Sequence, residues 1–212
     1  MGCESGVALK MKKVSNPLKL LGLLMAAMIF GGGCAGAVRS VVKSPEAIAE
    51  VSVSEIRRHL HNGDWLVIRG VTAADNLVTM ATNMPLSHAA IYDLENDQVI
   101  EADGSGVHVT PLADFVAKAQ RLLVIRPVWS GPETSAAAVA RARSWLGSGY
   151  NFTGLVGLSV PNRYYCTQLA IRAYEPFMAD MPNPVPLVIA PGQMYHWGRI
   201  MFDTGPGHRP SR

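Results

Sequence analysis

The chain has 212 residues, of which 49% are hydrophobic and 17% are charged, and its formal net charge is +3. This length suits one domain with a proper core and is too short for two large ones. Four lysines against one glutamate in residues 1–33 account for the whole net charge, so the rest of the chain is near neutral. A near-neutral domain gives no support to nucleic-acid binding, and we predict no nucleic-acid partner.

The N-terminal segment has the pattern of an export signal. Lysines precede an uninterrupted apolar run from Leu20 to Gly33. This run is shorter than the ~20 residues that span a bilayer comfortably. A basic start, a short apolar run and small residues at its end are typical of an export signal.

The apolar run ends in Phe-Gly-Gly-Gly-Cys, which resembles the lipobox of bacterial lipoproteins. The resemblance implies cleavage before Cys34 and lipidation of its thiol. A plain signal peptide and an uncleaved N-terminal anchor are the alternatives. We therefore expect a signal peptide over 1–33, a tether over 34–50 and one domain over 51–212, on the periplasmic side of the cell envelope and anchored to a membrane.

Helices and strands are expected in a clear order along the domain. The segment at 53–64 has helical spacing and ends at Asn62-Gly63, and "DWLVIRG" at 64–70 is an expected strand. Residues 72–86 fit either a helix or an irregular loop. Over 87–119 we expect, in order, a strand, a turn, a strand, a turn, a strand and a helix. A strand is expected over 121–128, and helices are expected over 131–150 and 166–177. The loop-rich tail should contain one apolar strand, "PVPLVIAP". Strands that cluster apart from helices indicate an α+β fold with a mainly antiparallel sheet.

One cysteine, Cys166, follows Cys34. Lipidation of Cys34 would leave Cys166 without an intramolecular disulfide partner in an oxidising compartment, which makes it a free thiol to explain. Cys166 stands at the start of an expected helix, where free N–H groups and the helix dipole favour an anion. A cysteine at such a place is more often a packing residue than a nucleophile, so this observation needs support from elsewhere.

His88 and Glu101 supply that support. If a four-residue turn from Asp93 to Asn96 joins their strands, His88 lies directly opposite Glu101, and both side chains project from one face. A carboxylate can then fix one imidazole nitrogen and leave the other to move a proton. Cys166, His88 and Glu101 can thus act as nucleophile, base and orienting acid. The alternatives are a structural His88 and a Glu101 that faces solvent.

These segments resemble a known group of enzymes. "GDWLVIRG", "SHAAIYD", "VIEADGSGVHVTPLADF", "VIRP", "GSGYNF" and "YYCTQLAIRAY" are similar to the permuted papain-like amidases of the NlpC/P60 superfamily, the YaeF/YiiX group, over about residues 63–176. The histidine precedes the cysteine, as in the permuted order. The resemblance implies the catalytic set Cys166, His88 and Glu101. For substrate binding it implies a substrate-side tyrosine at Tyr150 and a pocket residue at Tyr165.

The resemblance implies a circularly permuted papain-like fold, with the sheet packed against helices that carry the cysteine, and acyl chemistry without a cofactor or metal. The expected function is an exported cysteine hydrolase, an amidase or peptidase. Its substrate would be a peptidoglycan peptide, a lipid or a small amide of the envelope. An acyltransferase, a lipid-directed acyl hydrolase and a non-catalytic envelope-binding module are the alternatives, while a redox protein lacks a second thiol.

Overall fold

The computed structural model describes residues 53–178, 186 and 188–205. The predicted signal peptide, the tether and Cys34 lie outside these residues. The described helices are α2 (Val53–His59), α3 (Ala73–Thr82), η1 (Leu94–Asn96), α4 (Leu112–Ala117), α5 (Pro132–Ser144), η2 (Phe152–Val156), α6 (Cys166–Ala173), η3 (Glu175–Phe177) and η4 (Pro191–Trp197). The described strands are β1 (Trp65–Gly70), β2 (His88–Asp93), β3 (Gln98–Asp103), β4 (Gly106–Pro111), β5 (Ala119–Pro127), β6 (Gly149–Tyr150), β7 (Arg163–Tyr164) and β8 (Gly198–Asp203).

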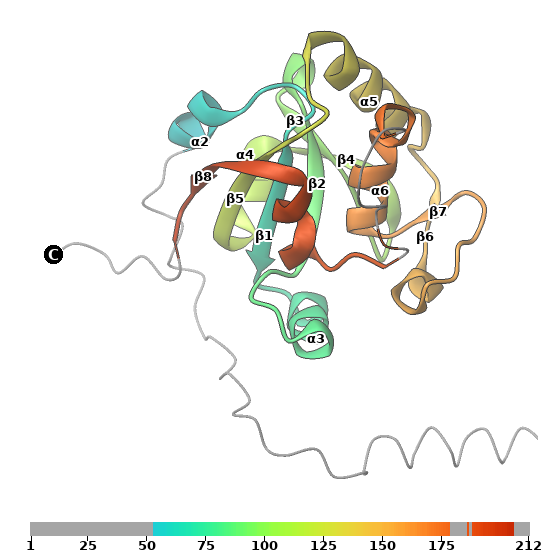
Figure 1. Ribbon diagram of the computed structural model, residues 1–212. Coiled ribbons are helices and arrows are strands. Elements are labelled where there is room, and N and C mark those ends of the chain that lie inside the picture. The colour runs from blue at the N-terminus through green and yellow to red at the C-terminus, as the bar shows by residue number, and fades with distance from the viewer. Residues whose placement is uncertain (1–52, 179–185, 187, 206–212) are drawn as a thin grey trace, which may run out of the picture. The chain divides into compact units, whose positions relative to one another are not determined.

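A six-stranded sheet forms the centre of the domain, with the strand order β4-β3-β2-β1-β5-β8. Every neighbouring pair in this sheet is antiparallel. A separate pair, β6 and β7, is parallel. The expected α+β class with a mainly antiparallel sheet is therefore confirmed (Figure 1).

Both faces of the central strands are buried, and β1 shows why its sequence is continuously apolar. Trp65 and Val67 belong to a core cluster that includes residues of α5, α6 and η4. Leu66 and Ile68, which alternate with them, belong to a second cluster with residues of α2 and α4. Because successive side chains of a strand point to opposite faces, a strand between two cores needs apolar residues at every position.

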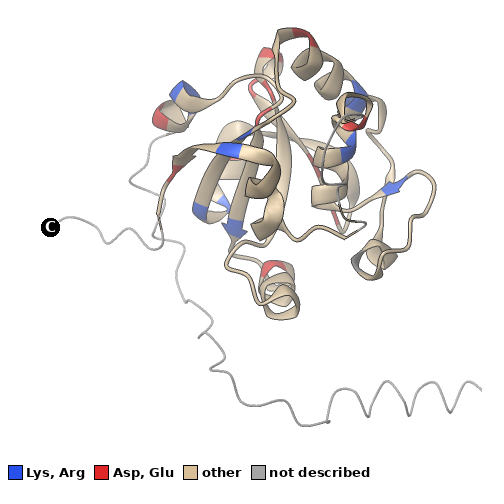
Figure 2. Ribbon diagram, viewed as in Figure 1, with Lys and Arg blue, Asp and Glu red and all other residues tan. Residues whose placement is uncertain are grey.

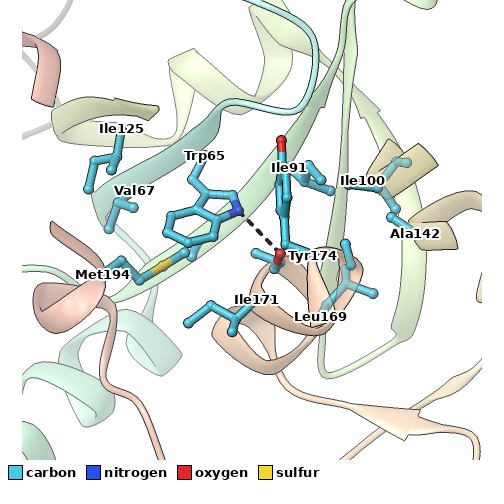
Figure 3. Close-up of a cluster of buried hydrophobic side chains, with 14 of the residues drawn as sticks. Trp65, Val67, Ile91, Ile100, Ile125, Ala142, Leu169, Ile171, Tyr174 and Met194 are labelled. Carbon is cyan, nitrogen blue, oxygen red and sulfur yellow. Dashed lines mark hydrogen bonds between the residues drawn. The ribbon is translucent and has the colours of Figure 1, made fainter. Parts of the chain in front are cut away.

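Helix α6 is fixed to the sheet by packing and by one hydrogen bond from β1. The Trp65 indole Nε1 donates to the Ala170 carbonyl at 3.2 Å (Figure 3). The Tyr174 hydroxyl, beyond the helix, donates to the Gly63 carbonyl at 3.0 Å. Leu169 is fully buried, and burial of such a side chain stabilises a fold by about 1.5–3 kcal/mol. These contacts hold the start of α6 in a defined place.

Residues 73–82 form helix α3, which resolves the helix-or-loop alternative. The Thr72 hydroxyl accepts a hydrogen bond from the Asp75 N–H at 3.2 Å, and the Asp75 carboxylate accepts one from the Thr72 N–H at 2.9 Å. This reciprocal arrangement satisfies two donors at the helix start. The sequence signal was the Thr-x-x-Asp spacing before the apolar residues.

The expected register between β2 and β3 is wrong by two residues. Ala90, not His88, lies opposite Glu101, and Asp93 pairs with Gln98. The turn has four residues, as expected, but it begins one residue later and closes with Asp97 in the left-handed region (φ 47°). A two-residue slip preserves the face of every side chain, whereas a one-residue slip would reverse it.

The tail also differs from expectation. The described part of "PVPLVIAP", which includes Val188, Ile189 and Ala190, is irregular and does not form the predicted strand. The tail strand is instead β8, which pairs antiparallel with β5 at the edge of the sheet. Edge strands are poorly marked in sequence because only one side of the backbone is paired; here Ile200 is 47% exposed, so the alternation of buried and exposed residues is weak.

A substitution at Gly106 tests the packing of the hairpin that joins β3 to β4. Its φ is +107°, and a Cβ there would lie 2.4 Å from the backbone oxygen of Ser148. We expect Gly106→Ala to lower the free energy of unfolding by about 2–3 kcal/mol, because strain and overlap add. Gly104→Ala is the matched control, since nothing lies within 4 Å of its added Cβ. Equal urea-unfolding midpoints for the two variants would contradict this account.

Candidate active site

Cys166 is the first residue of α6 and is 6% exposed. The first main-chain hydrogen bond of the helix runs from the Leu169 N–H to the Tyr165 carbonyl at 2.9 Å. The N–H groups of Cys166, Thr167 and Gln168 precede that bond and have no acceptor within the helix. The start of α6 therefore offers donors and the positive end of a helix dipole next to the thiol.

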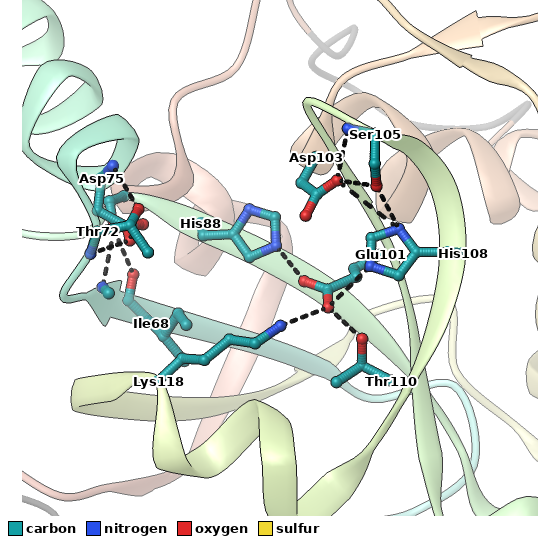
Figure 4. Close-up of polar contacts among 12 residues, drawn as sticks. Ile68, Thr72, Asp75, His88, Glu101, Asp103, Ser105, His108, Thr110 and Lys118 are labelled. Carbon is teal, nitrogen blue, oxygen red and sulfur yellow. Dashed lines mark hydrogen bonds and ion pairs between the residues drawn. The ribbon is translucent and has the colours of Figure 1, made fainter.

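His88 is the first residue of β2, and its ring connects two other groups. Its Nε2 lies 2.6 Å from Oε2 of Glu101, although the residues are diagonal rather than opposite on the sheet (Figure 4). Diagonal positions on one face are within reach of long side chains. Cys166 also acts on this ring, because its interaction with His88 raises the pKa of the imidazole. Because Nε2 faces Glu101, Nδ1 is the ring nitrogen left for the sulfur.

Glu101 is 1% exposed, so the solvent-facing alternative is wrong. Its second oxygen, Oε1, accepts a hydrogen bond from the Thr110 hydroxyl at 2.5 Å. The same oxygen lies 3.2 Å from Lys118 Nζ and 3.4 Å from Nε2 of His108 (Figure 4). Both carboxylate oxygens are therefore engaged, and only Oε2 faces His88.

These contacts shift the protonation of both residues. Burial opposes the charge on His88 and by itself lowers the pKa, but the contacts with Cys166 and Glu101 raise the pKa from 6.5 to about 10. Burial likewise raises the pKa of Glu101, yet the His88 hydrogen bond and charge, the Thr110 hydrogen bond and the Lys118 charge lower that pKa from 4.5 to about 2. At neutral pH the pair is an imidazolium and a carboxylate.

Tyr150 and Tyr165 both lie close enough to Cys166 to respond to charge there. Burial, followed by a negative charge on Cys166, raises the pKa of Tyr150. Burial also raises the pKa of Tyr165, whose hydroxyl accepts a hydrogen bond from the Ile189 N–H at 3.3 Å. All five predicted site residues of the domain are thus brought together, whereas the predicted lipidation residue Cys34 lies outside the described residues.

Nothing in the sequence singled out Thr110, Lys118 or His108 as site residues. His108 lies in β4 directly opposite Glu101, and Thr110 is two residues further along the same strand. The alternation of "VHVTP" was a usable signal, because residues two apart share a face of the sheet. Lys118 follows α4, and nothing in its local sequence connects it with Glu101.

The described part of the chain contains no group of three or more His, Cys, Asp or Glu side chains placed to hold a metal ion. In the same residues, no helix is both long and apolar enough to cross a bilayer.

The arrangement is suited to acyl transfer through sulfur. A protonated His88 stabilises a thiolate and can then give its proton to a leaving group. Glu101 holds the ring by one nitrogen, and that contact sets which nitrogen reaches the sulfur. The N–H groups at the start of α6 are placed beside the carbon that the sulfur would attack, where negative charge develops on oxygen.

The chain resembles known proteins at the level of family, sequence and fold. The model of a family described as permuted papain-like amidase enzyme, YaeF/YiiX, C92 family, matches residues 59–187. The probable lipoprotein peptidase YaeF of Escherichia coli (strain K12) is 29% identical over 111 residues, which cover 52% of this chain and 40% of that relative. A crystal structure of the metalloprotein yiiX from Escherichia coli O157:H7 is 22% identical and has a TM-score of 0.49, covering 61% of this chain and 78% of the other.

The match to the family model spans more than half of the chain and includes both His88 and Cys166. The chain therefore belongs to the C92 family of permuted papain-like amidases, the YaeF/YiiX group.

Proposed function

We propose that this protein is an exported, lipid-anchored cysteine amidase of the bacterial cell envelope, with Cys166 as nucleophile, His88 as proton carrier and Glu101 as the acid that positions His88. The observation that carries the proposal is the His88 ring, which Glu101 holds at 2.6 Å and whose pKa is raised by both Cys166 and Glu101. The order of His88, Glu101 and Cys166 in the chain is the permuted one. The relative named a lipoprotein peptidase supports an envelope location.

The reaction runs in two halves. The Cys166 thiolate attacks the carbonyl carbon of an amide, and the new C–S bond gives a tetrahedral intermediate. The imidazolium of His88 then protonates the amine as the C–N bond breaks, leaving a thioester. Neutral His88 next takes a proton from water, the hydroxide attacks the thioester carbon, and the C–S bond breaks. The acid is released, and the proton on His88 restores the initial ion pair.

Three further groups have roles in this scheme. The N–H groups at the start of α6 stabilise the oxyanion of each tetrahedral intermediate. Tyr150 lines the substrate side of the sulfur, consistent with the influence of Cys166 on its pKa. Tyr165, which precedes Cys166 and is 2% exposed, supports the pocket wall rather than the substrate. The substrate is a peptidoglycan stem peptide, an N-acyl lipid or a small amide.

A substrate panel tests the proposal. Purified full chain is incubated with muropeptides and, separately, with N-acyl lipids, and the products are identified by mass spectrometry. We expect a free carboxylic acid and an amine from one of these classes, with no product from Cys166→Ala. An added amine that captures the acyl group in preference to water would identify an acyltransferase instead. An absence of turnover, together with an unreactive Cys166 at neutral pH, would favour a non-catalytic binding module.

A further inference from the structure

Helix α3 exposes its apolar side to solvent. The exposed residues are Ala73, Ala74, Leu77, Met80 and Ala81, and all five are apolar. Leu77 and Met80 are 68% and 67% exposed. The half-buried residues of the same helix, which face the protein, are mostly polar. A helix on a soluble domain normally turns its apolar stripe inward, so this orientation is the reverse of the usual one.

A second apolar segment surrounds η2. Phe152, Val156 and Leu158 are 66%, 74% and 59% exposed. The ring of Tyr150 contacts Phe152 edge to face, with ring centroids 4.8 Å apart. We call the six residues Leu77, Met80, Phe152, Val156, Leu158 and Val188 the apolar rim, and Val188 is 38% exposed. Exposed large apolar side chains that gather in this way mark an interaction surface.

The apolar rim flanks the candidate active site on two sides. On one side, the Asp75 carboxylate of α3 accepts a hydrogen bond at 2.7 Å from the hydroxyl of Ser87, the residue before His88. On the other side, Gly154 of η2 packs so closely on the ring of Tyr165, the residue before Cys166, that an added Cβ would lie 2.4 Å from it. Each apolar segment is thus fixed to the neighbour of a catalytic residue.

The residues after 187 connect the two sides. A Cβ on Gly157, next to η2, would lie 3.6 Å from Val188, and a Cβ on Gly192 would lie 2.9 Å from the sulfur of Met84, which follows α3. The apolar rim therefore continues from η2 through this segment to the end of α3.

The rim segments carry almost no charge. Over residues 71–84, 150–164 and 188–197, the only Asp, Glu, Lys or Arg residues are Asp75 and Arg163. Figure 2 shows α3 and the loop around η2 as almost entirely uncharged, whereas acidic and basic side chains lie elsewhere on the domain. A partner recognised by ion pairs would find few contacts here. An apolar surface of this kind suits the acyl region of a lipid bilayer.

We propose that the apolar rim docks on the bilayer and inserts into its interfacial region, so that Cys166 faces the membrane surface. This inference rests on the lipid anchor of the proposed function. The roughly 19 residues from Cys34 to Val53 can span at most about 65 Å. A domain held within that distance meets the bilayer at high effective concentration, so a modest apolar surface suffices for docking. Substrates that lie in or at the membrane then reach the thiol directly.

Photo-crosslinking of the full chain tests this inference. The protein is reconstituted in neutral phosphatidylcholine vesicles that contain a lipid with a photoactivatable group on its acyl chain, and adducts are located by peptide mass spectrometry. We expect adducts on the peptides that contain Leu77 and Phe152. The matched internal control is Leu94, an equally apolar residue that is 51% exposed and follows the opposite end of β2 from His88. Its peptide should carry none.

A double variant, Leu77→Ser with Phe152→Ser, should reduce the remaining rim adducts about tenfold or more, because each lost side chain removes a substantial apolar contact. Adducts on the anchor segment should stay unchanged. High salt should have little effect, since the rim has almost no charge. Adducts on the anchor segment without any on the rim would overturn the inference and leave a second copy, or residues 179–185 of this chain, as the occupant. Absence of adducts on both would also overturn it.

The same measurement on Cys166→Ala separates this inference from the proposed reaction. Docking does not involve the thiol, so the pattern of adducts should be the same as in the unmodified protein. Rim adducts in a protein that turns over no substrate would support docking while contradicting the amidase. Turnover without rim adducts would support the amidase and contradict docking.

Discussion

Cys166→Ala is expected to abolish amide hydrolysis and labelling of the domain by iodoacetamide at neutral pH. Loss of a catalytic nucleophile reduces the turnover of hydrolases by about 10⁶-fold. Cys166→Ser should be almost as inactive, because a serine hydroxyl is not ionised by a neighbouring imidazolium. His88→Ala should retain the thiol but label much more slowly, since the positive partner of the thiolate is lost. All three variants are compared with the unmodified protein by their rates of labelling and by their turnover of one substrate.

Stability controls accompany these measurements. Cys166 is a small buried residue, so Cys166→Ala should unfold at nearly the same denaturant concentration as the unmodified protein. A folded Cys166→Ala variant that retains turnover would disprove the nucleophile. Equal labelling rates in His88→Ala and the unmodified protein would show that the imidazolium does not activate the sulfur.

Glu101→Gln should move the alkaline limit of amide hydrolysis to lower pH. In the unmodified protein the leaving amine takes its proton from His88, whose pKa is about 10, so kcat/KM should fall only above that pH. Removal of the Glu101 charge takes away one cause of the raised pKa. The alkaline limit should therefore fall by about 1–3 pH units. Glu95→Gln, an exposed glutamate on the same hairpin, should leave the profile unchanged.

The pair of His88 and Glu101 also makes the stability of the fold depend on pH. The direction of this dependence follows from the pKa shifts of the two residues. The folded-state pKa of Glu101 is lowered to about 2, so its stabilising contribution is complete above its ordinary pKa of 4.5 and disappears as the pH falls through about 2. The folded-state pKa of His88 is raised, so its contribution is complete below pH 6.5 and disappears as the pH rises through about 10. The Glu101→Gln variant should not show this loss of stability at acidic pH. Parallel acid-unfolding curves for the two proteins would contradict the ion pair.

The candidate site residues could be selected from the sequence because signals that are weak one by one support one another. Cys166 follows two tyrosines and opens an amphipathic helix, and the buried side of that helix was visible as apolar spacing. His88 and Glu101 lie in neighbouring strands joined by a short turn. Any even-numbered error in register keeps both side chains on one face, so their proximity survived the wrong pairing of His88 with Glu101.

The environment of Glu101 could not be read from the sequence. Thr110, His108 and Lys118 reach its second oxygen from β4 and from the end of α4. Lys118 in particular is 17 residues away and belongs to no motif. Long side chains adopt conformations that depend on packing across several elements, and local sequence does not specify that packing.

By itself, the sequence determined the α+β class and the order of the strands from β1 to β5 along the chain, and it singled out Cys166, His88 and Glu101 as candidates. Local periodicity and turn residues encode these features, because they depend on neighbours a few residues apart. The tertiary structure alone decided the diagonal geometry of His88 and Glu101, the edge strand β8 and the outward apolar side of α3. These features depend on which distant segments pack together. The apolar stripe on α3 is typical of a helix that faces a core, and only the fold shows that, within the described residues, none of its side chains is buried.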